Sequence, residues 1–403
     1  MNKEYLKSLE QKYGSPLYVY NAEKIISQYR RLEDAFSGVN NLKINYATKA
    51  LSNVSVLKLI KSLNGNLDCV SIQEVQLGLE AGFSPDQLCF TPSGVSMNEL
   101  DQAVSIGAKI TLDSLPVLKE FGLKYPDIPV SIRINPHIMA GGNKKISVGH
   151  VSSKFGISKE HMPEVLEIIK RTGTRIDGVH MHTGSDILDI DVFVRGAEVL
   201  FGLARNFDDL DFIDFGGGFK VAYKEEDPST DIEEFGKIMT NRFNEFCKDY
   251  GKDLAIEFEP GKFLVSECGY FLAKVNVVKP NTNTIFAGID SGLNHLIRPM
   301  YYDAYHHIDN ISNPIGEAKK YTVVGYICET DTFAKNRPIT EIRQGDVLSF
   351  KNAGAYCFSM ASNYNSRCRP AEVLVYQNKD YLIRERETFE DLLKHQIDVN
   401  LDL

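Results

Sequence analysis

The chain has 403 residues, of which 43% are hydrophobic and 25% are charged, as in ordinary globular proteins. Its 45 basic and 54 acidic residues give a formal net charge of −9, and the absence of a basic stripe argues against nucleic-acid binding. Seven cysteines occur without a Cys-x-x-Cys pair, which argues against a disulfide framework or a structural zinc site and favours a reducing cytoplasm. No apolar run reaches the length of a membrane span, so we expect no membrane association.

The first 26 residues combine a short amphipathic helical pattern with an extended segment at 16–20, and we expect this segment to pack with the C-terminal domain. Apolar β-type runs follow near residues 43–48, 67–71, 87–91, 109–113, 129–134, 176–181, 211–215 and 254–259. Helical patterns lie between most of them, at 53–63, 72–81, 97–106, 115–124, 160–171, 191–206 and 231–250. This alternation predicts a (β/α)8 barrel over residues 27–265, and an open doubly wound sheet is the alternative.

After residue 265 the helical periodicity nearly disappears until the end of the chain. Short β-type runs replace it at 270–278, 284–287, 322–326, 346–350, 372–376 and 381–384, followed by a helical pattern at 388–396. The pattern predicts a second, all-β domain over residues 266–403.

Lys49 follows the first predicted barrel strand, and the ends of such strands face the active site in parallel α/β folds. Burying an ammonium group is costly without a partner. An amine at this place is suited to a covalent bond with a carbonyl, as in a pyridoxal phosphate Schiff base. The alternative is an ordinary solvated lysine at a strand end.

Glycine-rich turns follow the seventh and eighth predicted strands, at Gly216-Gly217-Gly218 and at Gly261. Barrels often bind phosphate with these two loops, because backbone N–H groups approach an anion closely where no Cβ intrudes. A merely flexible turn is the alternative.

His180 and His182 end the sixth predicted strand, and strand alternation puts them on the same side. They could ligate a metal, but no third His, Asp or Glu stands at a supporting spacing nearby. We therefore favour contact with a bound ring. Further along, Cys328 precedes Glu329 and Asp331, and acidic surroundings keep a thiol protonated, which suits a proton donor. A small buried hydrophobe is the usual alternative for a cysteine.

Taken in order, the chain's motifs resemble those of the diaminopimelate decarboxylases, which are fold type III pyridoxal phosphate enzymes. The resemblance covers residues 40–375 and implies an alanine racemase-like barrel, a C-terminal β domain and a homodimer with shared active sites. It also implies decarboxylation of meso-2,6-diaminopimelate to L-lysine, the last step of lysine biosynthesis. The matching residues are 46–50, 180–185, 216–218, 259–261, 298–299, 328–331, 354–356 and 360–365.

The resemblance further implies roles for single residues. Lys49 would hold pyridoxal 5'-phosphate as an internal aldimine, and His182 would stack on its ring. Glu259 would pair with the ring nitrogen and keep it protonated, so that the ring can accept electrons. Cys328 of the partner chain would protonate the carbanion. The remaining cofactor contacts would come from Ser185, Gly217, Gly218, Gly261 and Tyr356.

The far end of the substrate carries an amine and a carboxylate, and the resemblance implies binding groups for both. Glu329 would bind the amine, while Arg298 and Tyr302 would bind the carboxylate, with Tyr356 close by. The family usually has arginine after Glu-Pro-Gly, where this chain has Lys262, which keeps the positive charge without the planar fork. We expect Lys262 near the cofactor and the substrate.

Three alternatives stay open. A related decarboxylase of ornithine, arginine or carboxynorspermidine would need a different set of groups for the distal end. A catalytically inactive regulator would lack the lysine or the cysteine, and both are present. A racemase would need an arginine-type partner for the ring nitrogen, where this chain has Glu259. Asp68 ends the second strand and is an ordinary strand-end acid unless it pairs with Lys49.

Overall fold

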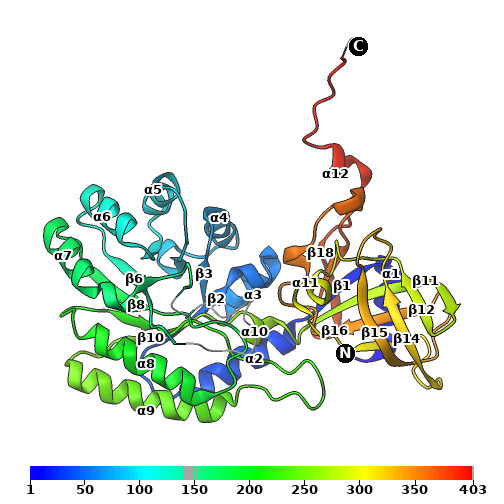
Figure 1. The fold of residues 1–403 in the computed structure, drawn as a ribbon, viewed down its shortest axis with the longest axis horizontal. Helices are drawn as coiled ribbons and strands as arrows, with labels where there is room; N and C mark the ends of the chain where they lie inside the picture. Colours follow the sequence, from blue (N-terminus) through cyan, green and yellow to red (C-terminus); the bar gives the residue numbers. More distant parts are fainter. Residues whose placement is uncertain (139–148, 150–151, 402–403) are drawn as a thin grey trace. The chain divides into compact units, whose positions relative to one another are not determined.

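The structure is a computed structural model that describes residues 1–138, 149 and 152–401. It divides into two compact units (Figure 1). The barrel unit comprises Ile26–Ala222 and Glu226–Leu264. The sheet unit comprises Met1–Ile25, the short segment Tyr223–Glu225 and the described residues from Val265 onward.

Parallel strands form the closed centre of the barrel unit. Eight strands of the described chain pair in the order β5-β4-β3-β2-β10-β9-β8-β6, and pairing of β5 with β6 closes the circle. Their bounds are β2 Leu42–Ala47, β3 Asn66–Cys69, β4 Leu88–Phe90, β5 Lys109–Leu112, β6 Val130–Asn135, β8 Ile176–His180, β9 Phe212–Asp214 and β10 Ala255–Phe258. The two-residue strand β7 (Ile157–Ser158) pairs with β6 outside this circle. The predicted barrel is confirmed, and the open sheet is excluded.

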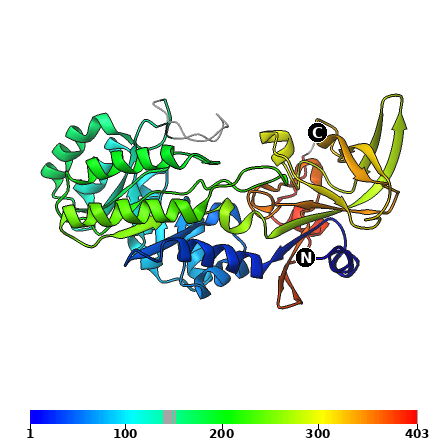
Figure 2. The same cartoon turned by 90° about the horizontal axis from the view of Figure 1, so that it is seen from below.

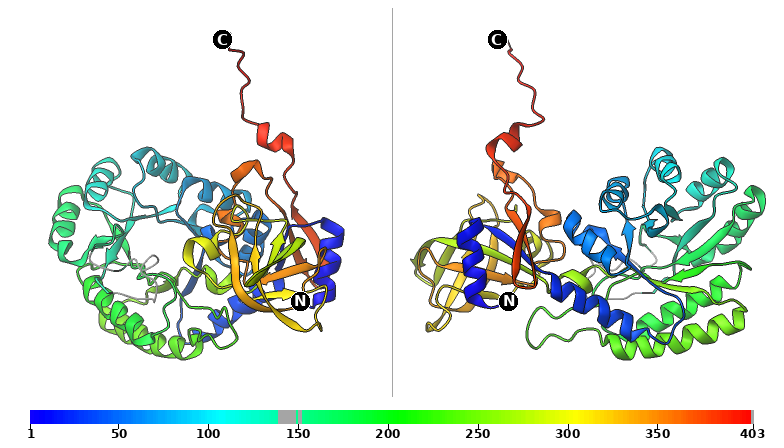
Figure 3. Two further views of the ribbon diagram at one scale, coloured as in Figure 1. Left: turned by 45° about the vertical axis from the view of Figure 1, so that its right-hand side comes forward. Right: turned by 180° about the vertical axis from the view of Figure 1, so that it is seen from behind.

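Helices surround the strands of the barrel unit (Figure 3). They are α2 Ala22–Ala35, α3 Val54–Ser62, α4 Ile72–Glu80, α5 Met97–Ile106, α6 Leu115–Lys124, α7 Met162–Thr172, α8 Ile190–Ala204, α9 Ile232–Tyr250 and α10 Lys262–Val265. Polar side chains cap the first turns of α3, α4, α8 and α9. Asp231 accepts from the N–H of Glu234 at the start of α9, and Gly251 ends that helix with φ 83°. Helix α2 is absent from the predicted elements, because we assigned its first residues to the N-terminal segment.

Helices α8 and α9 lie side by side on the outside of the barrel (Figures 1 and 2). A cluster of phenylalanines packs them on β9 and β10. Phe193 of α8 meets Phe235 of α9 edge to face, with ring centroids 4.6 Å apart, and Phe215 and Phe258 at the strand ends are 5.9 Å apart. This apolar packing holds the chain rigidly where β9 and β10 end.

The sheet unit contains a mixed sheet in which the order β15-β14-β12-β11-β1-β17-β18 is continuous, with β16 joining β11 to β13. The strands are β1 Leu17–Asn21, β11 Gly269–Asn281, β12 Thr284–Ile289, β13 Ile308–Asn310, β14 Ala318–Val324, β15 Thr332–Thr340, β16 Val347–Lys351, β17 Ala371–Tyr376 and β18 Lys379–Arg384. Helices α1 (Lys3–Tyr13), α11 (Arg298–Tyr302) and α12 (Phe389–Leu393) accompany them, so the unit is not purely β.

The N-terminal residues belong to the core of the sheet unit. Strand β1 pairs antiparallel with β11 and parallel with β17, which joins the two ends of the sequence. Leu6 and Leu9 of α1 pack into the same apolar cluster as Leu272 and Val373. None of the helices in the described part of the chain combines the length and apolar character that a bilayer crossing requires.

Candidate functional site

The C-terminal ends of the barrel strands gather charged side chains. Lys49 lies two residues beyond β2, in a short 3-10 turn (Thr48–Ala50), and its Nζ is 3.0 Å from Asp68 Oδ2. Parallel pairing of Ala47 with Asp68 places this acid beside the turn. Asp68 is therefore a partner of Lys49 and not the ordinary strand-end acid that we considered more typical.

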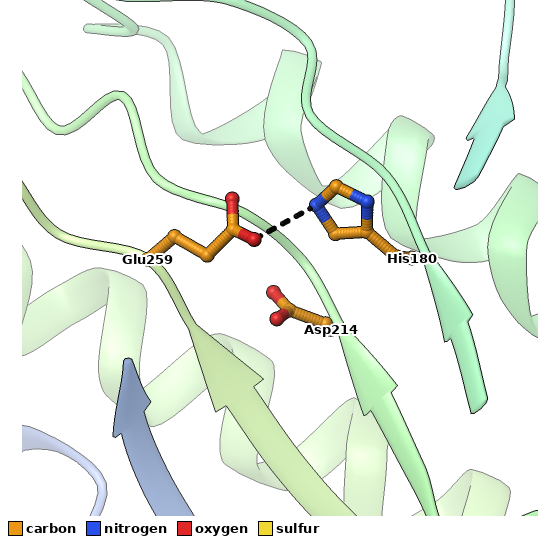
Figure 4. A group of neighbouring side chains, drawn as sticks. All are labelled: His180, Asp214 and Glu259. Atoms are coloured by element: carbon orange, nitrogen blue, oxygen red, sulfur yellow. Dashed lines mark ion pairs between the residues drawn. The ribbon is translucent and has the colours of Figure 1, made fainter. Parts of the chain in front are cut away.

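A second group of side chains lies at the ends of β8, β9 and β10, the last of which neighbours β2 (Figure 4). His180 and Asp214 are register partners on neighbouring strands, and Glu259 follows β10. His180 Nε2 lies 3.2 Å from Glu259 Oε1, and one donor atom of each of the three residues lies within 4.8 Å of the others. The sequence near His180 offers no acid at a supporting spacing, and its acidic neighbours Asp214 and Glu259 are distant in the chain and come from other strands.

Burial and neighbouring charges shift the pKa values of the two carboxyl groups of this cluster in opposite directions. Burial and the adjacent Glu259 raise the pKa of Asp214 well above its usual range. Burial also acts to raise the pKa of Glu259, but His180 and Lys49 outweigh it and lower that pKa below its usual range. The two pKa values are thus shifted in opposite directions, which makes Glu259 the stronger acid of the pair.

The loop after β9 is held tightly between its neighbours. The Glu259 N–H donates to the Gly216 carbonyl at 2.9 Å, and the Ile187 N–H donates to the Gly218 carbonyl at 2.9 Å. A Cβ on Gly217 would lie 2.2 Å from the Glu259 carbonyl oxygen, and one on Gly218 would lie 2.1 Å from that of Gly184. Only glycine fits at either position, and Gly218 also has φ 105°.

His182 lies just past β8 and contacts this loop. Its Nδ1 accepts a hydrogen bond from the Gly217 N–H at 3.1 Å, which places the proton of the neutral ring on Nε2. Burial and nearby Arg133 lower the pKa of His182 to about 3, so the ring is neutral at physiological pH. An uncharged imidazole can stack on a cationic ring without repulsion.

The remaining predicted residues of the barrel unit flank the glycine loop. Ser185 is half-buried in the loop after β8. Gly261 follows β10 and directly precedes Lys262, whose side chain is 8% exposed. The ammonium of Lys262 forms an ion pair with Asp186, the residue after Ser185. The pair therefore joins the loops that follow β8 and β10.

Several buried polar atoms near the strand ends have no hydrogen-bond partner among the described residues. Among the described residues, Asp68 Oδ1, both ring nitrogens of His180 and Thr183 Oγ1 are buried without a hydrogen bond. Buried polar groups are normally satisfied. Together with an amine, an anionic carboxylate and a glycine-lined loop, these atoms fit a polar aromatic cofactor that carries a phosphate and a carbonyl.

In the sheet unit, Arg298 begins α11 and is 7% exposed. Its Nη2 donates to the Tyr223 hydroxyl at 3.1 Å, and its guanidinium lies 5.4 Å from the ring centroid of Tyr223 and 5.9 Å from that of Tyr302. Burial raises the pKa of Tyr302, so its hydroxyl stays protonated. The sequence analysis missed Tyr223, since nothing local links it to Arg298.

Cys328 and Glu329 lie in the turn before β15, and Cys328 is exposed. Asn365 Nδ2 donates to Cys328 Sγ at 3.4 Å, and the Tyr364 hydroxyl donates to Glu329 Oε1. The sheet unit thus brings this turn to the segment at 360–365 that we singled out from sequence. Tyr356 lies in the preceding loop with φ 56°, a conformation uncommon for a bulky residue.

Comparison with known proteins identifies the protein family. A family model described as "Pyridoxal-dependent decarboxylase, pyridoxal binding domain" matches residues 22–266, the range of the barrel and its charged strand ends. A diaminopimelate decarboxylase of Methanothermobacter thermautotrophicus is 40% identical over 398 residues, covering 96% of this chain and 93% of the relative.

Solved structures agree with this relationship. Diaminopimelate decarboxylase from Helicobacter pylori complexed with L-lysine has a TM-score of 0.89 and 34% identity, covering 96% of this chain and 98% of the other. The M. jannaschii enzyme in co-complex with L-lysine has a TM-score of 0.88 and 30% identity, covering 97% and 94%. The chain belongs to the diaminopimelate decarboxylase family. The resemblance and the fold class that we expected from sequence are confirmed.

Proposed function

We propose that this chain decarboxylates meso-2,6-diaminopimelate to L-lysine and CO₂ with pyridoxal 5'-phosphate, as the last step of lysine biosynthesis. Two ion pairs at the C-terminal ends of the barrel strands carry the proposal. Lys49 pairs with Asp68, and Glu259 contacts His180. When bound, pyridoxal phosphate supplies a ring that accepts the electron pair released as CO₂ leaves.

The side chains of the barrel unit provide the covalent anchor and the electrostatics. Lys49 Nζ would hold the cofactor through its aldehyde, with Asp68 orienting this amine. Glu259 would keep a proton on the ring nitrogen, and neutral His182 would lie against the ring. The backbone N–H groups of the loops bind the phosphate, and the residues concerned are Ser185, Gly217, Gly218, Gly261 and Lys262.

The sheet unit supplies substrate recognition and the proton. Arg298 and Tyr302 bind the distal carboxylate, with Lys262 and Tyr356 beside the substrate, and Glu329 binds the distal amine. Cys328 donates a proton from Sγ to the α-carbon that has lost CO₂. We accordingly assign residues 27–265 to a barrel that binds pyridoxal phosphate and residues 266–403 to a domain that contributes catalytic and substrate-binding residues, while Lys262 comes from the barrel unit.

We further propose a homodimer in which Cys328 of one chain serves the barrel of the other, and a cytoplasmic location among other amino-acid biosynthetic enzymes. Support for the shared site comes from the division of the expected roles, since cofactor residues lie in one unit and the proton donor in the other.

Lys49→Ala tests the cofactor assignment. We expect it to abolish both the visible absorbance of the bound cofactor and CO₂ release, because no other amine can replace the covalent anchor. Lys58→Ala, which changes an exposed lysine of α3, should behave like the wild type. Full turnover by Lys49→Ala would contradict the proposal.

A side-by-side assay of CO₂ release tests the substrate. We expect release from meso-2,6-diaminopimelate and little from ornithine, arginine or carboxynorspermidine, because a distal carboxylate is needed to pair with Arg298. Faster release from any of these three would replace the proposed substrate with that one.

A further inference from the structure

Glu259 and Asp214 form a buried pair of carboxyl groups. Glu259 is 8% exposed and Asp214 is 4% exposed, and their nearest oxygens lie within 4.8 Å of each other. Two charged carboxylates at such a spacing cannot both be stable away from water, so the pair holds one proton. The chemistry of the site depends on which residue holds it.

The contacts of the two groups are different. Asp214 Oδ1 accepts the Gly216 N–H at 2.7 Å, and its Oδ2 faces the Asn45 amide at 3.3 Å. Asp214 also neighbours the buried acid Glu257, its register partner on β10. Glu259 instead has His180 Nε2 at 3.2 Å from Oε1. The imidazole thus contacts the carboxylate of Glu259 (Figure 4).

We propose that His180 is a positioning residue that localises the negative charge on Glu259, orients its carboxylate toward the cofactor ring nitrogen, and leaves the shared proton on Asp214. His180 is 1% exposed at the end of β8, and its ring is fixed by the strand rather than by a mobile loop. Its Nε2 lies 3.2 Å from Glu259 Oε1, which leaves the second oxygen of this carboxylate available to the ring nitrogen.

This role of His180 rests on the proposed function, because it concerns the ring nitrogen of the bound cofactor. It predicts what removal of the imidazole does. Without the imidazole, the proton of the pair redistributes toward Glu259, and a neutral Glu259 no longer holds a proton on the ring nitrogen. The covalent anchor at Lys49 and the glycine loop are unchanged. The cofactor therefore still binds, while its spectrum changes and kcat falls more than KM changes.

The test compares His180→Leu and His180→Gln with His295→Gln, a buried histidine of the sheet unit that contacts Ser291 and the Cys368 carbonyl. We expect His180→Leu to lower kcat on the order of 100-fold and His180→Gln about tenfold, since glutamine keeps a hydrogen-bond donor but loses the ring that fixes its position. Both should shift the absorption spectrum of the Lys49-bound cofactor. His295→Gln should leave that spectrum unchanged.

The cofactor-free protein gives a second readout, the infrared band of protonated carboxyl groups. This band should lose intensity in Asp214→Asn, whereas in His180→Leu it should shift in frequency at unchanged intensity, because the shared proton moves from Asp214 to Glu259. If His180→Leu does not fold, as judged by thermal unfolding, His180→Gln decides the outcome.

Two results would distinguish failure of the His180 proposal from failure of the proposed function. If the His180 variants bind the cofactor with a wild-type spectrum and wild-type kcat, His180 has no positioning role and the proposal is overturned. If the wild-type protein itself does not bind pyridoxal phosphate at Lys49, the proposed function fails instead. An infrared band that is unaffected by Asp214→Asn would show that Asp214 is not the protonated member of the pair.

Discussion

Single acidic residues around the barrel mouth show how burial changes their charge. Glu74 lies at the start of α4, where its Oε2 accepts the Val70 N–H at 2.7 Å and Ser71 Oγ accepts the Glu74 N–H at 3.2 Å. Burial raises the pKa of Glu74 to about 7, although the hydrogen bond from Val70 lowers it. The folded protein therefore prefers the neutral form of this residue.

The sign of the resulting pH dependence follows from linkage. The folded-state pKa lies above the ordinary glutamate pKa of about 4.5, so the contribution of Glu74 to stability is complete below about pH 4.5 and is lost as pH rises through about 7. Glu74→Gln keeps an acceptor oxygen without the charge. We expect it to raise the free energy of unfolding above pH 7 by on the order of 2–3 kcal/mol, with little change at acid pH.

Urea unfolding at several pH values measures this difference. Glu80→Gln, on the exposed side of the same helix, is the matched control and should show no comparable pH-dependent gain. An equal gain for Glu74→Gln at low and high pH would mean that charge burial is not the cause.

At the scale of elements, the loop between β9 and α9 depends on close backbone contacts. Gly218 combines φ 105° with a Cβ position 2.1 Å from the Gly184 carbonyl oxygen, so any side chain would push the loops after β8 and β9 apart. These are the loops to which we assign phosphate binding. The proposed phosphate binding therefore requires these two loops to stay in close contact.

Gly218→Ala should weaken pyridoxal phosphate binding by about tenfold and lower stability by at least about 1 kcal/mol, since both strain and a backbone clash oppose it. Gly202→Ala is the control, because an added Cβ there meets nothing within 4 Å and the position is within helix α8. It should be neutral or slightly stabilising. Cofactor titration and thermal unfolding measure both variants, and unchanged cofactor affinity in Gly218→Ala would contradict the assigned role of this loop.

At the scale of the whole molecule, the expected active-site residues are distributed over two units. Lys49 and Glu259 lie in the barrel unit, and Cys328 and Arg298 lie in the sheet unit. The proposed roles therefore draw on residues of both units, and the proposed dimer would supply these residues from different chains.

Mixing inactive variants tests this arrangement. In dimers formed from Lys49→Ala and Cys328→Ala chains, one site of each mixed dimer combines an intact lysine with an intact cysteine. After refolding or subunit exchange, about a quarter of all sites should be active by random pairing. Each variant alone serves as the control, and no recovery of CO₂ release on mixing would argue against shared sites.

The sequence by itself determined the features that depend on local patterns. Period-2 and period-3.6 apolar patterns predicted the barrel strands and most helices to within a few residues, because burial on one face imposes these periods. The lysine after β2 and the glycines after β9 were also recognisable, because each lies directly next to a strand. Strand β15 and helix α11 were missed, since their apolar pattern is weak.

Tertiary structure alone decided the partnerships between strands. Asp68 meets Lys49, and His180 meets Glu259, because parallel register aligns residues that are 19 and 79 positions apart in the chain. In the same way, Tyr223 reaches Arg298 across 75 positions. Local sequence carries no information about such pairings, since they are set by which strands close the barrel and where each strand ends.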